Sequence, residues 1–108
     1  MQQSDLIRIK HMIDAAEEAI SFAKGKQRKD LNTERMLVLS VIKEIEIIGE
    51  AASKISTEVK AEYSNIPWDE ITGMRNHLVH GYFDVDLDML WNTIKQDLPL
   101  LIANLKKM

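Results

Sequence analysis

The chain has 108 residues, of which 45% are hydrophobic and 29% charged; its net charge is −3, and it contains no cysteine. These values predict one globular domain, residues 1–108, and they exclude a disordered or membrane-spanning chain. The acidic balance excludes a protein that coats nucleic acid with a broadly basic surface. The lack of cysteine excludes disulfide scaffolds and cysteine nucleophiles and fits a reducing compartment. Because no apolar run approaches the length of about 20 residues that a spanning helix needs, we expect a cytoplasmic protein without membrane contacts.

Apolar residues recur at spacings of three and four along most of the chain, which predicts amphipathic helices. The first helix is expected over residues 4–23, and the second and longest over about 33–55. A second apolar row, with Leu39 and Ile42, should widen the buried face of this second helix. Gly49 within it costs about 1 kcal/mol relative to alanine, so we expect another helix to pack closely there.

The C-terminal half continues the same pattern. Residues 57–65 predict a short helix and turn, and Pro67 can begin a third main helix that carries polar residues around position 75. Asp86 can cap a fourth helix, which Pro99 should kink or restart. The predicted fold class is therefore all-α, an up-down bundle of four or five helices, with enough apolar surface to serve a dimer.

Four cations lie within six residues between the first two expected helices: Lys24, Lys26, Arg28 and Lys29. Because the chain is acidic overall, this is the best candidate for a local contact with nucleic-acid phosphates. The alternative is a solvated loop between helices, where charged runs are common.

The segment from Arg75 to Tyr82 holds a guanidinium, an amide, two imidazoles and a phenol. A planar donor that is always charged and a side chain that titrates near neutral pH suit phosphodiester chemistry without a metal. On one ideal helix Arg75 and His80 would diverge by about 140°. They therefore need a helix break near Gly81, or a second copy across a two-fold axis, to act together.

Each of these residues also has a structural interpretation. Arg75 can pair with Asp69, Glu70 or an acid on another helix, and a cation near a helix C-terminus is favourable with the helix dipole. His77 and His80 have the spacing of two metal ligands, but no third ligand stands at an obvious spacing. We therefore expect no metal and no cofactor.

Taken together, the run Arg75-x4-His80-x-Tyr82, the preceding residues 66–74 and the segment Glu46–Ala52 resemble the HEPN superfamily, and within it the HepT-like toxins. The resemblance extends over nearly the whole chain. Proteins of this kind are all-α dimers that act as metal-independent endoribonucleases, and each is encoded beside a minimal nucleotidyltransferase that serves as its antitoxin.

The resemblance implies that Arg75 and His80 are the catalytic pair for RNA cleavage by the 2′-hydroxyl, and that Asn76 supports them. It also implies that Tyr82 receives AMP from the cognate nucleotidyltransferase, which neutralises the toxin. One alternative is a non-catalytic helical subunit that binds substrate or nucleotide for that nucleotidyltransferase. Another is a structural dimerisation module.

Overall fold

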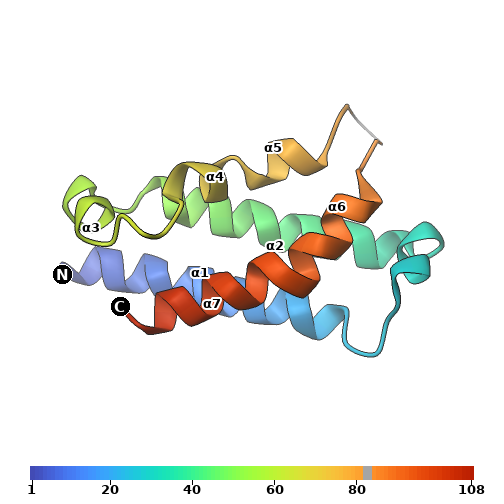
Figure 1. The fold of residues 1–108 in the computed structure, drawn as a ribbon, viewed down its shortest axis with the longest axis horizontal. Helices are drawn as coiled ribbons and strands as arrows, with labels where there is room; N and C mark the ends of the chain where they lie inside the picture. Colours follow the sequence, from blue (N-terminus) through green and yellow to red (C-terminus); the bar gives the residue numbers. More distant parts are fainter. Residues whose placement is uncertain (82–83) are drawn as a thin grey trace.

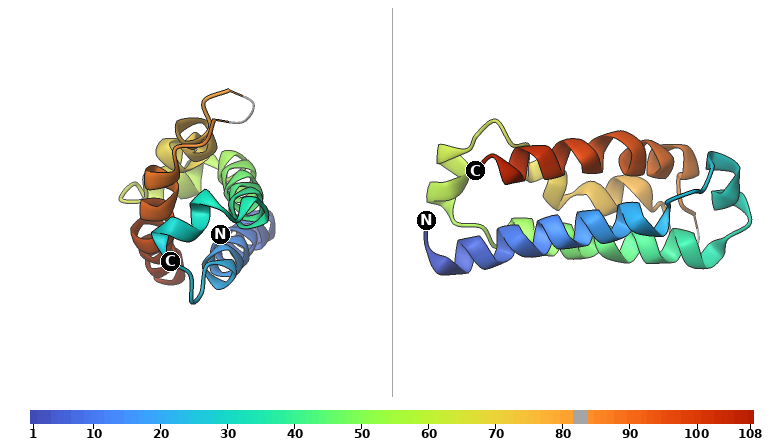
Figure 2. Two further views of the ribbon diagram at one scale, coloured as in Figure 1. Left: turned by 90° about the vertical axis from the view of Figure 1, so that its right-hand side faces the viewer. Right: turned by 90° about the horizontal axis from the view of Figure 1, so that it is seen from below.

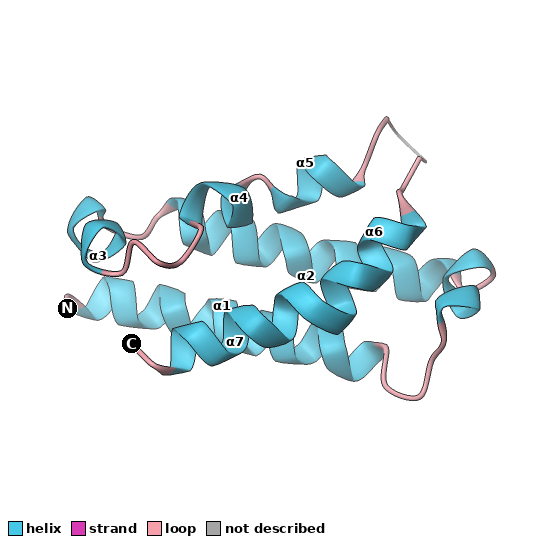
Figure 3. Ribbon diagram, in the orientation of Figure 1, coloured by secondary structure: helices cyan, strands magenta, loops and turns pink. Residues whose placement is uncertain are grey.

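The computed structural model describes residues 1–81 and 84–108. Figure 1 shows its elements in chain order: α1 (Gln3–Phe22), the 3-10 helix η1 (Arg28–Asn32), α2 (Arg35–Ser53), α3 (Thr57–Glu62), α4 (Trp68–Thr72), α5 (Met74–Leu78), α6 (Leu87–Asn92), the π-helical segment η2 (Thr93–Asp97) and α7 (Leu98–Lys106). In the part of the chain that the structure describes, no strand forms (Figure 3), so the all-α prediction is confirmed.

The helices form an elongated up-down bundle that measures 43 × 28 × 20 Å. α1 and α2 run antiparallel along the long axis, α7 packs on α1, and α4 and α5 pack on α2 (Figures 1 and 2). Both termini lie at one end of the bundle, whereas η1 and the connection from α5 to α6 lie at the other. Among the described residues, no helix has the length and apolar character needed to cross a lipid bilayer.

The core follows the predicted periodicity along α1, α2 and the last two helices. Its fully buried side chains include Met12, Ile45, Ile48, Leu90, Ile94 and Leu98. Each side chain of this size contributes about 1.5–3 kcal/mol when it is removed from water. Ala16 and Ala19 of α1 are both fully buried, and such small side chains let the helices that pack on α1 approach closely.

The structure corrects three predictions. Leu39 does not widen the buried face of α2, because it lies on the outer side of the helix and is 48% exposed, whereas Ile42 is buried. The connection before the second helix is not only a loop: η1 forms within it, closed by reciprocal hydrogen bonds between Gln27 and Asp30, and α2 begins at Arg35, close to the approximate start that was predicted. The third main helix is not continuous, because it breaks at Gly73 into α4 and α5 and ends at Leu78.

Two predicted boundaries are confirmed. The carboxylate of Asp86 caps α6 by accepting a hydrogen bond from the backbone N–H of Met89 at 3.0 Å. The last helix restarts around Pro99, since α7 begins at Leu98 directly after η2. Proline has no N–H to donate and its ring crowds the carbonyl of Lys95, so the wider π-helical turn relieves that contact.

The carboxyl group of Glu44 is buried where α2 packs on α1. Glu44 is only 6% exposed, and its Oε2 has no hydrogen-bond partner among the described residues. Burial, together with a hydrogen bond and charge repulsion from Glu18, raises the pKa of Glu44 to about 7. The folded chain therefore keeps a proton on Glu44 at a pH where an exposed glutamate has lost it.

This proton makes stability depend on pH. Between about pH 5 and 7 the folded chain binds more protons than the unfolded chain, so its free energy of unfolding should fall as the pH rises and level off above pH 7. Glu44→Gln, which is neutral throughout, should reduce this slope and raise the unfolding midpoint at pH 8 by about 5 °C. Thermal unfolding followed by circular dichroism measures both, with Glu17→Gln as the control for an exposed acid on α1. A wild-type slope retained in Glu44→Gln would contradict the assignment.

Candidate functional site

The segment that carries the polar motif is anchored to α2 through α4. Trp68 and Ile71 are buried beneath it, at 6% and 3% exposure. A Cβ placed on Gly49 would lie 3.1 Å from the carbonyl oxygen of Thr72, a contact so tight that the backbone of Thr72 would have to move by a few tenths of an ångström to admit a side chain. The prediction that Gly49 serves close helix packing is confirmed.

Arg75 lies directly after this contact, and its guanidinium reaches across to α2. Its Nε donates to Oε2 of Glu46 at 3.2 Å, and its Nη1 donates to Oδ1 of Asn76 at 3.5 Å. The other carboxylate oxygen of Glu46 lies 3.9 Å from Nζ of Lys43. Of the pairings that the sequence left open for Arg75, the structure therefore contains the one with an acid on another helix.

A polar hollow of about 310 Å³ opens beside Arg75, between α2 and the segment from α4 to α5. The residues that line this Arg75 hollow are Ile45, Glu46, Gly49, Glu50, Ser53, Thr72, Arg75 and Asn76. Glu50 forms an ion pair with Lys54 at 2.9 Å, which lowers the pKa of Glu50. The hollow thus offers amide, hydroxyl and guanidinium groups at a solvent-accessible surface, together with the carboxylates of Glu46 and Glu50, which are paired with Arg75 and Lys54.

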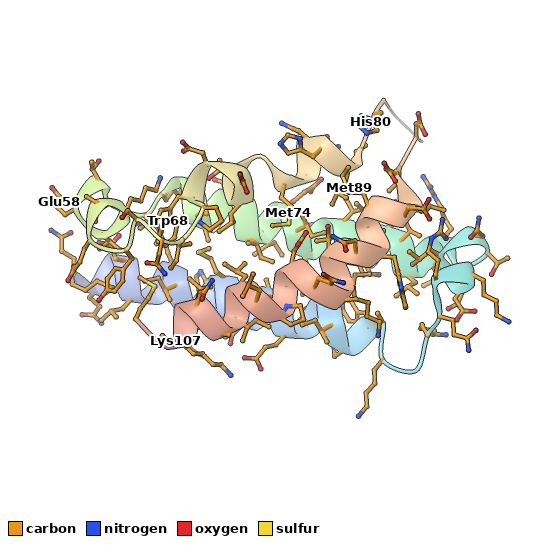
Figure 4. The ribbon with its side chains drawn as sticks, viewed as in Figure 1. Glu58, Trp68, Met74, His80, Met89 and Lys107 are labelled. Carbon is orange, nitrogen blue, oxygen red and sulfur yellow. The ribbon has the colours of Figure 1, made fainter. Side chains whose placement is uncertain are left out.

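His80 lies beyond the end of α5, at the upper edge of the bundle (Figure 4). Its backbone N–H donates to the carbonyl of Asp84, and the N–H of Asp86 donates to the carbonyl of Leu78 at 2.8 Å. Gly81 has a φ of +89°, a conformation that glycine adopts without strain. The predicted helix break is confirmed, and it leaves His80 exposed on a connection whose two ends are hydrogen-bonded together.

The structure brings only part of the predicted constellation together. Arg75 and Asn76 are in contact, but no hydrogen bond joins the Arg75 and His80 side chains in the described residues. Tyr82 lies outside the described residues. His77 lies elsewhere: it lines a groove of about 480 Å³ between α5 and the last two helices. Met74 and Met89, which are labelled in Figure 4, line the same groove. Among the described residues, no three His, Asp or Glu side chains gather into a potential metal site.

Two of the four cations between α1 and α2 form ion pairs with acids of the same chain. Lys26 pairs with Glu34 at 2.8 Å, which raises the pKa of Lys26. Arg28 pairs with Asp88 in the first turn of α6 at 2.7 Å and also donates to Asn32. Lys24 and Lys29 are exposed. The contact between Arg28 and Asp88 holds this loop at the same end of the bundle as the connection that carries His80.

Glu46 is the residue of this candidate site for which no role was predicted from the sequence. An acid in a long amphipathic helix has the appearance of a solvated surface residue. Its position three residues before Gly49 places both residues on the same side of α2. This spacing could have indicated that Glu46 lies near Arg75, but only once α4 is known to pack at Gly49.

Comparison with protein families gives one match, which covers most of the chain. Residues 12–108 match the family model described as "Ribonuclease HepT-like". No solved structure shows a significant match.

Individual relatives extend over the whole chain. A protein of Thermococcus cleftensis named "Probable ribonuclease HepT" is 33% identical over 100% of this chain and 98% of its own length. A proposed RNase of Caldanaerobacter subterraneus is 33% identical over 92% of this chain and 88% of its own length. A Methanocaldococcus jannaschii protein, named as both a gamma-glutamylcyclotransferase and a proposed RNase, is 36% identical over 99% of this chain. The chain spans about half of that last protein, at 48% of its length.

The close contact at Gly49 can be tested by adding one methyl group. An alanine normally stabilises a helix by about 1 kcal/mol relative to glycine. In Gly49→Ala the methyl would instead press on the backbone of Thr72, so we expect a net loss of about 1–2 kcal/mol and a lower unfolding midpoint. Urea unfolding measures the change, with Ser40→Ala on the same helix as a control. A more stable Gly49→Ala variant would show that α4 can move away from α2.

Proposed function

The chain belongs to the HepT-like ribonuclease family, and from this membership we propose that it is an endoribonuclease that cleaves RNA without a metal ion, with Arg75 and His80 as its catalytic pair. The observation that carries the proposal is how the guanidinium of Arg75 is bonded and where it lies. Its guanidinium is held by Glu46 and Asn76 at the edge of the Arg75 hollow, with N–H groups still available to a phosphate.

The proposed reaction uses the nucleophile of the RNA itself. The 2′-oxygen forms a bond to the adjacent phosphorus, the bond from phosphorus to the 5′-oxygen breaks, and the products are a 2′,3′-cyclic phosphate and a 5′-hydroxyl. One His80 imidazole accepts the proton of the 2′-hydroxyl, and a protonated imidazole supplies a proton to the leaving 5′-oxygen. Arg75 stabilises the negative charge that grows on the phosphorane oxygens, and Asn76 supports its placement.

We propose that the active form is a homodimer, because the mechanism uses two imidazoles and one chain supplies a single His80. Two observations support this. In the part of one copy that the structure describes, no hydrogen bond joins the side chains of Arg75 and His80, so a second copy would help to complete the site. The outer side of α2 also carries three exposed large apolar side chains, Met36, Leu39 and Ile47, which suit an interface between identical chains.

The proposed biological setting is a toxin–antitoxin pair whose partner is a minimal nucleotidyltransferase. In this proposal the phenol oxygen of Tyr82 attacks the α-phosphorus of ATP and loses its proton, and pyrophosphate leaves. The AMP group would then sit two residues from His80, adding bulk and negative charge. Such a group would exclude the RNA strand from Arg75 and repel its phosphates.

A second candidate function is a non-catalytic subunit that binds nucleotide for the nucleotidyltransferase. It is favoured by one observation: Lys26 and Arg28 are paired with acids of the same chain, so they offer little attraction to a long RNA strand. In this case Arg75 would hold a nucleotide phosphate and perform no proton transfer with His80.

Cleavage of labelled RNA in excess EDTA distinguishes the two candidates. We expect wild type to produce 2′,3′-cyclic phosphate ends, Arg75→Ala and His80→Ala to be at least about 100-fold slower, and His77→Ala, which alters a different groove, to retain activity. A 3′-hydroxyl product with an absolute magnesium requirement would contradict the mechanism. Wild type as inactive as both variants would favour the nucleotide-binding subunit.

Modification of Tyr82 can be followed by intact-protein mass spectrometry. With the nucleotidyltransferase and ATP, wild type should gain the mass of one or more AMP units, and Tyr82→Phe should gain none because it lacks the acceptor oxygen. The chain has one other tyrosine, so Tyr63→Phe is the matched control and should be labelled like wild type. Equal labelling of Tyr82→Phe would place the acceptor elsewhere.

A further inference from the structure

Glu46 is the one acid that touches the guanidinium of Arg75, in the part of the chain described, and it comes from a different helix. We propose that Glu46 is a positioning residue: it holds the Nε edge of Arg75 so that the opposite edge of the guanidinium faces the scissile phosphate. This inference rests on the proposed ribonuclease function and assigns to it a residue outside the Arg-x4-His motif.

The hydrogen bonds around Arg75 determine which donors remain for substrate. A guanidinium carries five N–H groups in a rigid planar fork. The Nε–H is used by Glu46, and one Nη1–H is used by Oδ1 of Asn76. Three donors are left over, one on Nη1 and two on Nη2, and two of these that point the same way can bind two phosphate oxygens at once. Glu46 thereby fixes the plane of the fork as well as the edge that it presents.

Glu46 is itself fixed with respect to Arg75. It lies three residues before Gly49, where the backbones of α4 and α2 are in close contact, so the distance from Glu46 to the start of α5 depends on backbone packing. Lys43 lies 3.9 Å from Oε1, the oxygen that Arg75 does not use. The lysine partly offsets the negative charge of Glu46, which favours entry of a phosphate beside it.

The expected sizes of the two effects favour a role of Glu46 in orienting Arg75 over a role in stabilising the fold. The side chains of Arg75 and Glu46 are 43% and 40% exposed, and an ion pair at such a surface contributes at most about 1 kcal/mol to folding. In contrast, a misplacement of about 1 Å in a reacting group can lower a rate by about 100-fold. Loss of Glu46 should therefore change catalysis far more than it changes the unfolding midpoint.

Steady-state kinetics on RNA test the proposal. Glu46→Ala should lower kcat by about 10- to 100-fold while KM stays within about 3-fold, because substrate still binds but the guanidinium is free to turn. Glu46→Gln should recover to within about 3-fold of wild type, since its amide oxygen can still accept the Nε–H. The control is Glu17→Ala, which breaks another half-exposed ion pair between helices, with Lys106 at 3.4 Å, and should leave kcat and KM unchanged.

A second measurement needs no activity. In ¹⁵N-labelled protein the Nε–H resonance of Arg75, assigned through Arg75→Lys, should be protected from exchange with water, lose that protection in Glu46→Ala and keep it in Glu46→Gln. Activity of Glu46→Ala equal to or above that of wild type would overturn the proposal, and a rise would identify Glu46 as a competitor of the phosphate. If wild type cleaves RNA no faster than Arg75→Ala, the proposed function fails instead, whatever the resonance shows about the contact.

Discussion

The close contact between Gly49 on α2 and the carbonyl of Thr72 decides where the returning chain lies. A side chain at Gly49 would separate the two backbones, and α5, which begins two residues after Thr72, would move with them. The contact therefore determines how far Arg75 lies from Glu46 and how wide the hollow beside them is. A glycine costs about 1 kcal/mol of helix propensity in α2, and this cost is offset by the packing of Trp68 and Ile71 that it permits.

Arg75 and His80 are held in different ways, and the difference suits the chemical roles that we propose for them. A group that stabilises charge in a transition state is most effective when its orientation is fixed before the reaction, as the contacts with Glu46 and Asn76 achieve for Arg75. A group that transfers protons must exchange them with water between turnovers. The connection after α5 exposes the His80 side chain while it holds the backbone in place through Asp84.

The sequence predicted the helices better than it predicted their faces. Apolar spacing located α1, α2 and the cap at Asp86, because these depend on residues close together in the chain. It misplaced Leu39, since spacing alone does not say which side of a helix its neighbours will cover. In the site, the residue types of Arg75 and His80 stood out from the sequence. Glu46 did not, because its contact joins positions 29 residues apart and exists only through the packing of α4 on α2.

A chain with a net charge of −3 cannot draw RNA in through a long-range field. In the free chain Glu46 also offsets part of the charge of Arg75, so the attraction at the site itself is modest. What this arrangement offers a phosphate is a fork of donors already turned to one edge, which a bidentate contact can use without further ordering of the side chain. Glu46 therefore has two opposed effects on phosphate binding: it orients the guanidinium of Arg75, and it offsets part of the positive charge of that group. The proposed role requires that the gain from a fixed guanidinium exceed the loss from its partial neutralisation, and Lys43 beside Glu46 shifts that balance toward orientation.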